Sequence, residues 1–100
     1  MTQNNWENLK YLVVKDQDAN VLKTLAGGPK SFSELKKEAK IKHKSSLARS
    51  IRRLSSRYLL TYEKPFYRAS SDGRGMLELY NKAKKRAEEY DIEISSLEKN

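Results

Sequence analysis

The feature that most constrains the fold of this chain is the segment HKSSLARSIRRLSSRYLL, residues 43–60, because its side chains divide into two opposite faces. With about 100° of rotation per helical residue, one narrow stripe is apolar and consists of Leu47, Ile51, Leu54 and Tyr58. The opposite side is polar and basic and consists of Ser45, Arg49, Arg52, Arg53 and Ser56. The pattern predicts an amphipathic helix that is held on a domain by its apolar stripe and points its basic face outward.

A first helix is predicted upstream, over ANVLKTLA, residues 19–26. Its Val21, Leu22 and Leu25 fall on one side, so we expect them to face the core. Asp16 or Asp18 is expected to cap its start, and the glycines and proline of residues 27–29 are expected to end it. Further upstream, residues 4–16 favour a helix with Trp6, Leu9 and Val13 on one side, although KYLVV is also compatible with a strand.

A second helix has a stronger start signal. Ser31 and Glu34 have the spacing of a capping box, in which each side chain accepts the free backbone N–H of the other. We expect this helix to run to about Lys40 and to bury Leu35 and Ala39. A short link, IKHK, connects it to the basic segment.

The C-terminal part predicts a hairpin and a long helix. The runs LLTYE and FYRAS are aromatic and β-branched, and Lys64-Pro65 between them suits a turn. Ser70 is expected to cap the final helix, over residues 71–97. Apolar side chains recur there at alternating steps of four and three residues, which indicates a heptad seam. The seam consists of Met76, Tyr80, Ala83, Ala87, Tyr90, Ile94 and Leu97. The alternating DIEIS leaves open a helix end near Tyr90.

Length and composition narrow the class of protein. A chain of 100 residues has room for one core, so residues 1–100 are predicted to form a single domain. No apolar run approaches the roughly 18 residues of a membrane span, and MTQNNWENLK lacks the pattern of a signal peptide. We therefore expect a cytoplasmic protein without a membrane partner. The absence of cysteine excludes disulfides and thiolate metal sites.

The positive charge is concentrated in the middle of the chain. The net charge is +8. Residues 29–68 contain twelve Lys or Arg against three Asp or Glu, whereas the other sixty residues contain nine against ten. No acidic residue occurs between Ala39 and Tyr62. A surface field of one sign favours a polyanionic partner.

The predicted order is helix, capped helix, basic helix, hairpin, helix. Three stretches, DANVLKTLAGGPKSFSELKKEA, SSLARSIRRLSSRYLL and YRASSDGRGMLELY, resemble the signature stretches of small prokaryotic and archaeal winged-helix transcription regulators of the MarR, ArsR and PadR type. They cover most of residues 18–80. Two positions depart from the family pattern, because Lys40 and Lys42 replace a glycine in the link and Tyr58 replaces a glycine after the basic helix. The resemblance implies a mainly α fold with a small β-hairpin wing (α+β), that is, a winged helix-turn-helix with a long C-terminal helix.

The resemblance also implies how such a chain meets double-stranded DNA. Residues 44–57 would be the recognition helix, with its N-terminal turns nearest the bases in the major groove. The expected base contacts are Ser45, Ser46 and Arg49. The expected backbone contacts are Lys42, His43, Lys44, Arg52, Arg53 and Arg57. Lys64 and Arg68 would let the wing touch flanking DNA. In the alternative, Tyr62, Phe66 and Tyr67 pack on the sheet and the wing is too short to reach.

The implied function is a sequence-specific transcription regulator that acts as a homodimer and associates with the nucleoid. The seam residues Met76, Tyr80, Ala83, Ala87, Tyr90 and Ile94 are the expected dimer interface, because winged-helix proteins often pair through terminal helices. In the alternative, the seam packs on Trp6, Leu9 and Val13 of the same chain. Two other functions stay open: an architectural protein that coats DNA with little sequence preference, and a module that binds an acidic protein.

An enzymatic function finds no site in the sequence. His43 is the only histidine, it has no nearby carboxylate to orient it, and there is no cysteine to act as its nucleophile. A single histidine also argues against a metal centre. Glu88 and Glu89 lie beside lysines, as on a solvated helix face. We therefore expect no catalytic residue, metal or cofactor.

Overall fold

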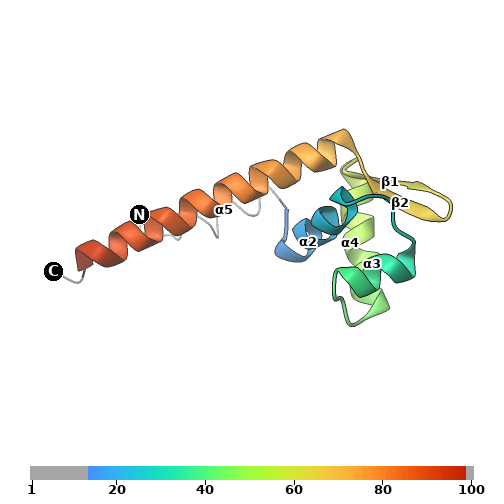
Figure 1. The fold of residues 1–100 in the computed structure, drawn as a ribbon, viewed down its shortest axis with the longest axis horizontal. Helices are drawn as coiled ribbons and strands as arrows, with labels where there is room; N and C mark the ends of the chain where they lie inside the picture. Colours follow the sequence, from blue (N-terminus) through green and yellow to red (C-terminus); the bar gives the residue numbers. More distant parts are fainter. Residues whose placement is uncertain (1–13, 99–100) are drawn as a thin grey trace.

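A computed structural model describes the backbone of residues 14–98 and the side chains of residues 14–91. The elements follow the order α2 (Asp16–Ala26), α3 (Phe32–Glu38), α4 (Lys44–Ser56), β1 (Leu60–Glu63), β2 (Phe66–Ala69) and α5 (Ser71–Glu98). Figure 1 shows α2, α3 and α4 gathered beside the hairpin, while α5 extends away from them as a long rod. The predicted mainly α fold with a small hairpin is confirmed. The helix predicted around Trp6, Leu9 and Val13 lies outside the described residues.

Helix α2 lies at the centre of the domain and packs against α3, α4, α5 and β2. The predicted inward residues of α2 are fully buried, namely Val21, Leu22 and Leu25. They meet Leu35 of α3 and Leu47 and Leu54 of α4, which are also fully buried. Burial of each such side chain contributes about 1.5–3 kcal/mol, so this apolar contact holds α3 and α4 on α2.

The two predicted helix starts have different outcomes. The capping box of α3 is confirmed, because Glu34 N–H donates to Ser31 Oγ and Ser31 N–H donates to Glu34 Oε1. The cap predicted for α2 is wrong. Asp16 and Asp18 lie inside the first turn, and the N-cap is Lys15, which makes no side-chain cap. Both carboxylates instead bind side chains far away in the sequence.

Two of the three residues that stand where the family has glycine have the left-handed backbone that favours glycine. Lys40 has φ 57° and Tyr58 has φ 59°. Lys40 turns the chain from α3 into the link, and Tyr58 turns it from α4 toward β1. This turn also corrects one expectation about the apolar stripe. Tyr58 is 79% exposed, because α4 ends at Ser56 and the reversed backbone carries Tyr58 off the buried face.

The hairpin is antiparallel and pairs Tyr62 with Tyr67 and Thr61 with Arg68. Side chains alternate between its faces, so Tyr62 and Tyr67 share one face. Lys30, ahead of α3, forms an isolated bridge with Tyr67: each residue's N–H donates to the other's carbonyl, at 3.1 and 2.7 Å. The hairpin is thereby fixed to the segment that starts α3.

Helix α5 starts in close contact with the end of α4. The predicted cap is confirmed, because Gly73 N–H donates to Ser70 Oγ at 2.9 Å. The same hydroxyl donates to the Tyr58 carbonyl at 2.7 Å. A Cβ on Gly73 would lie 2.0 Å from the Leu59 carbonyl oxygen, so only glycine fits this crossing.

The side chains of the apolar seam of α5 differ in how far they are buried. Met76 packs against the domain core, and Tyr80 is buried with its hydroxyl donating to Asp16 Oδ1 at 2.6 Å. Burial and this hydrogen bond raise the pKa of Tyr80. The expectation that Tyr80 faces a second copy is therefore wrong, because its own domain covers it. Tyr90 is half-exposed, and the helix continues past it to Glu98.

Candidate nucleic-acid interface

The outward face of α4 carries the predicted contact residues. Lys42 and His43 precede the helix and are exposed, and His43 is its N-cap residue. Lys44, Ser45, Arg49, Arg52 and Arg57 are exposed along the helix or at its end. Ser46 is half-buried, and its carbonyl accepts from Gln17 Nε2 at 3.1 Å. Most of the contact residues predicted from the sequence are therefore exposed before, along or just after α4.

Arg53 departs from this pattern. Its Nε and Nη2 donate to the two oxygens of Asp18 at 2.9 and 2.8 Å, and Nη2 also donates to Ser50 Oγ at 3.2 Å. These hydrogen bonds raise the pKa of Arg53. The sequence placed Arg53 on the outward basic face as a backbone contact, whereas in the structure its guanidinium neutralises a carboxylate that is only 5% exposed.

The polar contact between α2 and α4 was missed by sequence reasoning. Ser50 is fully buried and accepts from Gln17 Nε2 at 2.6 Å. One signal could have located Ser50, since it lies three residues after Leu47 and four before Leu54 and therefore beside the apolar stripe. Nothing local in the sequence indicates that Gln17 and Asp18 lie opposite it. This network fixes the orientation of α4 on the domain.

The hairpin places Lys64 in its turn, where the side chain is exposed. Arg68 is exposed on β2, with its Nε 3.9 Å from Glu63 Oε1. The turn contains a cis peptide bond between Lys64 and Pro65. Both basic residues of the predicted wing are therefore on the surface, where a large ligand can reach them.

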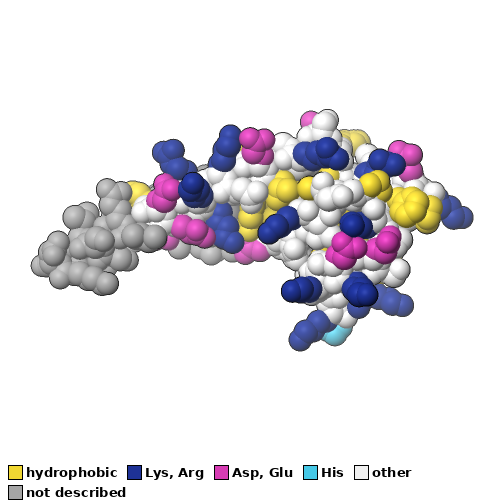
Figure 2. Space-filling model, viewed as in Figure 1, with side chains coloured by type: hydrophobic (Ala, Val, Ile, Leu, Met, Phe, Trp, Pro, Cys, Tyr) yellow, Lys and Arg dark blue, Asp and Glu magenta, His cyan; other side chains and the backbone are white. Residues whose placement is uncertain are grey.

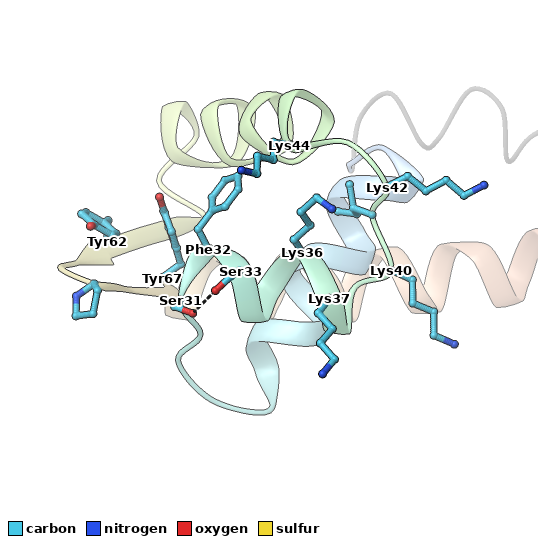
Figure 3. Close-up of a pocket in the computed structure, with 12 residues that line it drawn as sticks. Ser31, Phe32, Ser33, Lys36, Lys37, Lys40, Lys42, Lys44, Tyr62 and Tyr67 are labelled. Carbon is cyan, nitrogen blue, oxygen red and sulfur yellow. Dashed lines mark hydrogen bonds between the residues drawn. The ribbon is translucent and has the colours of Figure 1, made fainter.

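A groove of about 960 Å³ lies between α3, the link to α4 and the hairpin. Its aromatic side chains are Phe32, Tyr62 and Tyr67, and its cationic ones are Lys36, Lys37, Lys40, Lys42 and Lys44. Figure 3 shows Phe32 rising from α3 toward Lys44, Tyr67 between Phe32 and the hairpin, and Tyr62 farther out. Packing on the sheet was one alternative for Tyr62 and Tyr67 in the sequence, Phe32 was given no role there, and no groove was predicted.

Charge is unevenly distributed over the surface. Figure 2 shows Lys and Arg side chains clustered around the histidine at the lower end of the molecule. Another basic side chain lies beside apolar side chains at the end where Figure 1 places the hairpin. Magenta carboxylates lie on the side of the domain, along α5 and at the hairpin end, but none is visible beside the histidine. The region around the start of α4 is therefore suited to bind an anion.

Two other properties concern the described part of the chain. Within residues 14–98, no helix is both long enough and apolar enough to cross a membrane. The described side chains, those of residues 14–91, include no group of three or more His, Cys, Asp or Glu placed to hold a metal ion.

Comparisons with known proteins identify the fold. No protein-family model and no curated protein matches the sequence. Among solved structures, BpsR of Bordetella bronchiseptica has a TM-score of 0.70 and 19% identity over 84% of this chain and 65% of its own. This chain therefore spans less than two thirds of BpsR. YodB of B. subtilis has a TM-score of 0.68 and 18% identity over 83% of this chain and 94% of its own.

A third similar structure is NadR in complex with 4-hydroxyphenylacetate, with a TM-score of 0.62 and 27% identity. The match covers 89% of this chain and 67% of NadR. The BpsR structure concerns regulation of its DNA binding by 6-hydroxynicotinic acid. These neighbours are MarR-like winged-helix transcription regulators. Their likeness, together with the helix order and the hairpin, shows that the chain has the winged helix-turn-helix fold.

Proposed function

We propose that this protein is a transcription regulator that binds double-stranded DNA with α4 in the major groove. The observation that carries the proposal is the outward face of α4, which is basic and is followed by an exposed basic hairpin. The winged-helix fold supports it, because this fold presents its recognition helix to DNA in the same way. BpsR, which shares the fold, is a DNA-binding protein.

Within this proposal, the first turns of α4 contact base edges through Ser45, Ser46 and Arg49. Arginine can donate two hydrogen bonds to guanine, which makes Arg49 the main candidate for sequence discrimination. The proposed phosphate contacts are Lys42, His43, Lys44, Arg52 and Arg57, with Lys64 and Arg68 from the wing. Arg53 is left out of this set because Asp18 and Ser50 already engage its guanidinium.

We further propose that the protein acts as a homodimer through the outer part of α5. Tyr90 is about half exposed on this part of the helix, Leu79 is about half exposed nearer the domain, and α5 extends well beyond the domain that it leaves. Apolar side chains on a projecting helix favour burial against a second copy. Light scattering at micromolar concentration should give twice the monomer mass, and a persistent monomer would contradict the dimer without affecting the DNA-binding proposal.

DNA binding is tested by selecting bound fragments from random duplexes and then titrating the selected and the random DNA by fluorescence anisotropy. A regulator should bind its selected site at least about 10³-fold more tightly than random DNA. An architectural protein would give a ratio near one. A module for an acidic protein would show no steep dependence of duplex affinity on salt.

The assignment of α4 is tested with Arg49→Ala. We expect about a tenfold loss of affinity for the selected site and a smaller loss for random DNA, because a base contact carries sequence information. Lys82→Ala is the matched control, since Lys82 is an exposed cation on α5 that pairs with Glu78. Equal affinities of the Arg49 and Lys82 variants would contradict the proposed interface.

A further inference from the structure

The groove between α3 and the hairpin contains aromatic side chains that have no role in the proposed binding of a duplex. We propose that it binds a short unpaired segment of a nucleic-acid strand, with a base stacked on Tyr62 and phosphates held by the surrounding lysines. The proposal goes beyond recognition of a duplex by α4. It concerns a different form of nucleic acid and a surface that shares only Lys42 and Lys44 with the proposed duplex contacts.

The aromatic side chains form a row from the surface to the core. The Tyr62 and Tyr67 rings are 4.6 Å apart between centroids, and the Tyr67 and Phe32 rings are 6.5 Å apart. Phe32 packs against the core, whereas Tyr62 is 53% exposed. Phe32 and Tyr67 therefore anchor the hairpin to α3, and Tyr62 extends the row outward with much of its ring available to a ligand. Exposed aromatic rings beside cationic side chains are the usual platform for unpaired bases.

The charges around the groove favour an anionic ligand. Five lysines line it, and they come from α3, from the link and from the start of α4. None of the described residues that line it is acidic. Because the cations are spread over three segments, they suit a chain of successive phosphates better than a single carboxylate.

The aromatic row favours an unpaired strand over a duplex. In a duplex the bases stack on one another, so the outer surface offers sugars and phosphates but no base faces. A duplex in the groove could use the lysines, but it would leave Tyr62 without a stacking partner. An unpaired strand offers both groups at once, since each base has a free face and each linkage has a charge.

The groove also lies next to the proposed duplex surface. Lys42 and Lys44 line the groove and belong to the proposed phosphate contacts of α4. An unpaired end that leaves a duplex near the start of α4 would therefore enter the groove directly. Only this continuity depends on the proposed function, because stacking on Tyr62 does not require a duplex.

The test compares three labelled DNAs by fluorescence anisotropy: a blunt duplex, the same duplex with an overhang of about six thymidines, and the free thymidine oligomer. The wild-type protein should bind the overhang DNA about tenfold more tightly than the blunt duplex. Tyr62→Ala should remove this gain and leave blunt-duplex affinity within about twofold, and Tyr62→Phe should restore it because the ring is retained. Phe66→Ala is the matched control, since Phe66 is 42% exposed on the opposite face of the same hairpin.

Equal wild-type affinity for overhang and blunt DNA would overturn the inference, as would a gain that survives Tyr62→Ala or is lost equally in Phe66→Ala. The free oligomer separates the two proposals. If no duplex binds but the oligomer binds in a Tyr62-dependent way, the proposed regulator function fails and the groove assignment stands. If the duplex binds, the overhang gives no gain and the oligomer does not bind, the groove assignment fails and the proposed regulator function stands.

Discussion

Arg53 of α4 and Asp18 of α2 form a two-point ion pair across the centre of the domain, with nitrogen–oxygen distances of 2.9 and 2.8 Å. Asp18 is nearly inaccessible to water, so the pair and its bond to Ser50 set how α4 is rotated on α2. The exposed arginines of α4 depend on this rotation for their direction. A residue that looks like a DNA contact in the sequence therefore positions the helix that carries the proposed contacts.

Replacement of Arg53 should destabilise the fold. We expect Arg53→Ala to lower the free energy of unfolding by about 2 kcal/mol, because it leaves the Asp18 carboxylate buried without a counterion. The loss should be smaller than for a fully enclosed pair, because the Arg53 side chain is 35% exposed. Urea denaturation followed by circular dichroism measures the change. Arg52→Ala, at the adjacent exposed position, should change stability by no more than about 0.5 kcal/mol; equal effects of the two substitutions would refute the role of the pair.

Two glycines at the start of α5 should respond in opposite directions to alanine. In Gly73→Ala the new Cβ would meet the Leu59 carbonyl at 2.0 Å, so backbone must shift and stability should fall by about 2 kcal/mol or more. In Gly75→Ala the Cβ would meet no atom within 4 Å, so the higher helix propensity of alanine should raise stability by about 1 kcal/mol. Thermal unfolding of both variants measures the difference. Similar shifts of the same sign would contradict the close crossing at Gly73.

The left-handed backbone at Lys40 and Tyr58 predicts that glycine is stabilising there. Lys40→Gly and Tyr58→Gly should each raise the free energy of unfolding by about 0.5–1 kcal/mol, because relief of the φ penalty exceeds the added entropy of the unfolded chain. Lys37→Gly is the matched control within α3, and it should lower stability by about 1 kcal/mol. If Lys40→Gly destabilises as much as Lys37→Gly in chemical denaturation, the strain at Lys40 is absent.

The capping box predicts a pH dependence of stability. The hydrogen bond from the Ser31 N–H lowers the pKa of Glu34 below its ordinary 4.5. Because the folded state favours the carboxylate, the stability that Glu34 contributes is fully present well above pH 4.5 and is lost as pH falls through the folded pKa. In Glu34→Gln the cap is retained but does not titrate. Denaturation curves at several pH values should therefore show wild type losing stability relative to Glu34→Gln below pH 4.5, and parallel curves would contradict this.

Local patterns were sufficient for most of the fold. The basic segment predicted α4 because its apolar residues repeat every three or four positions, and Leu47 and Leu54 are indeed fully buried. The Ser31 and Glu34 capping box and the Ser70 cap depend on residues at most three apart, so their chemistry is visible in the sequence. The position of Tyr58 was predicted wrongly because helical periodicity does not show where a helix ends.

The sequence by itself determined which segments become helices, where the hairpin lies and which face of α4 is basic, because these properties depend on neighbours within about one helical turn. Only the tertiary structure decided which charged side chains remain exposed to a ligand and which are paired within the domain. Asp18 and Arg53 are 35 residues apart, and only the packing of α2 on α4 pairs them. The groove arises in the same way, since α3, the link and the hairpin each contribute side chains that have no pattern in common until the chain folds.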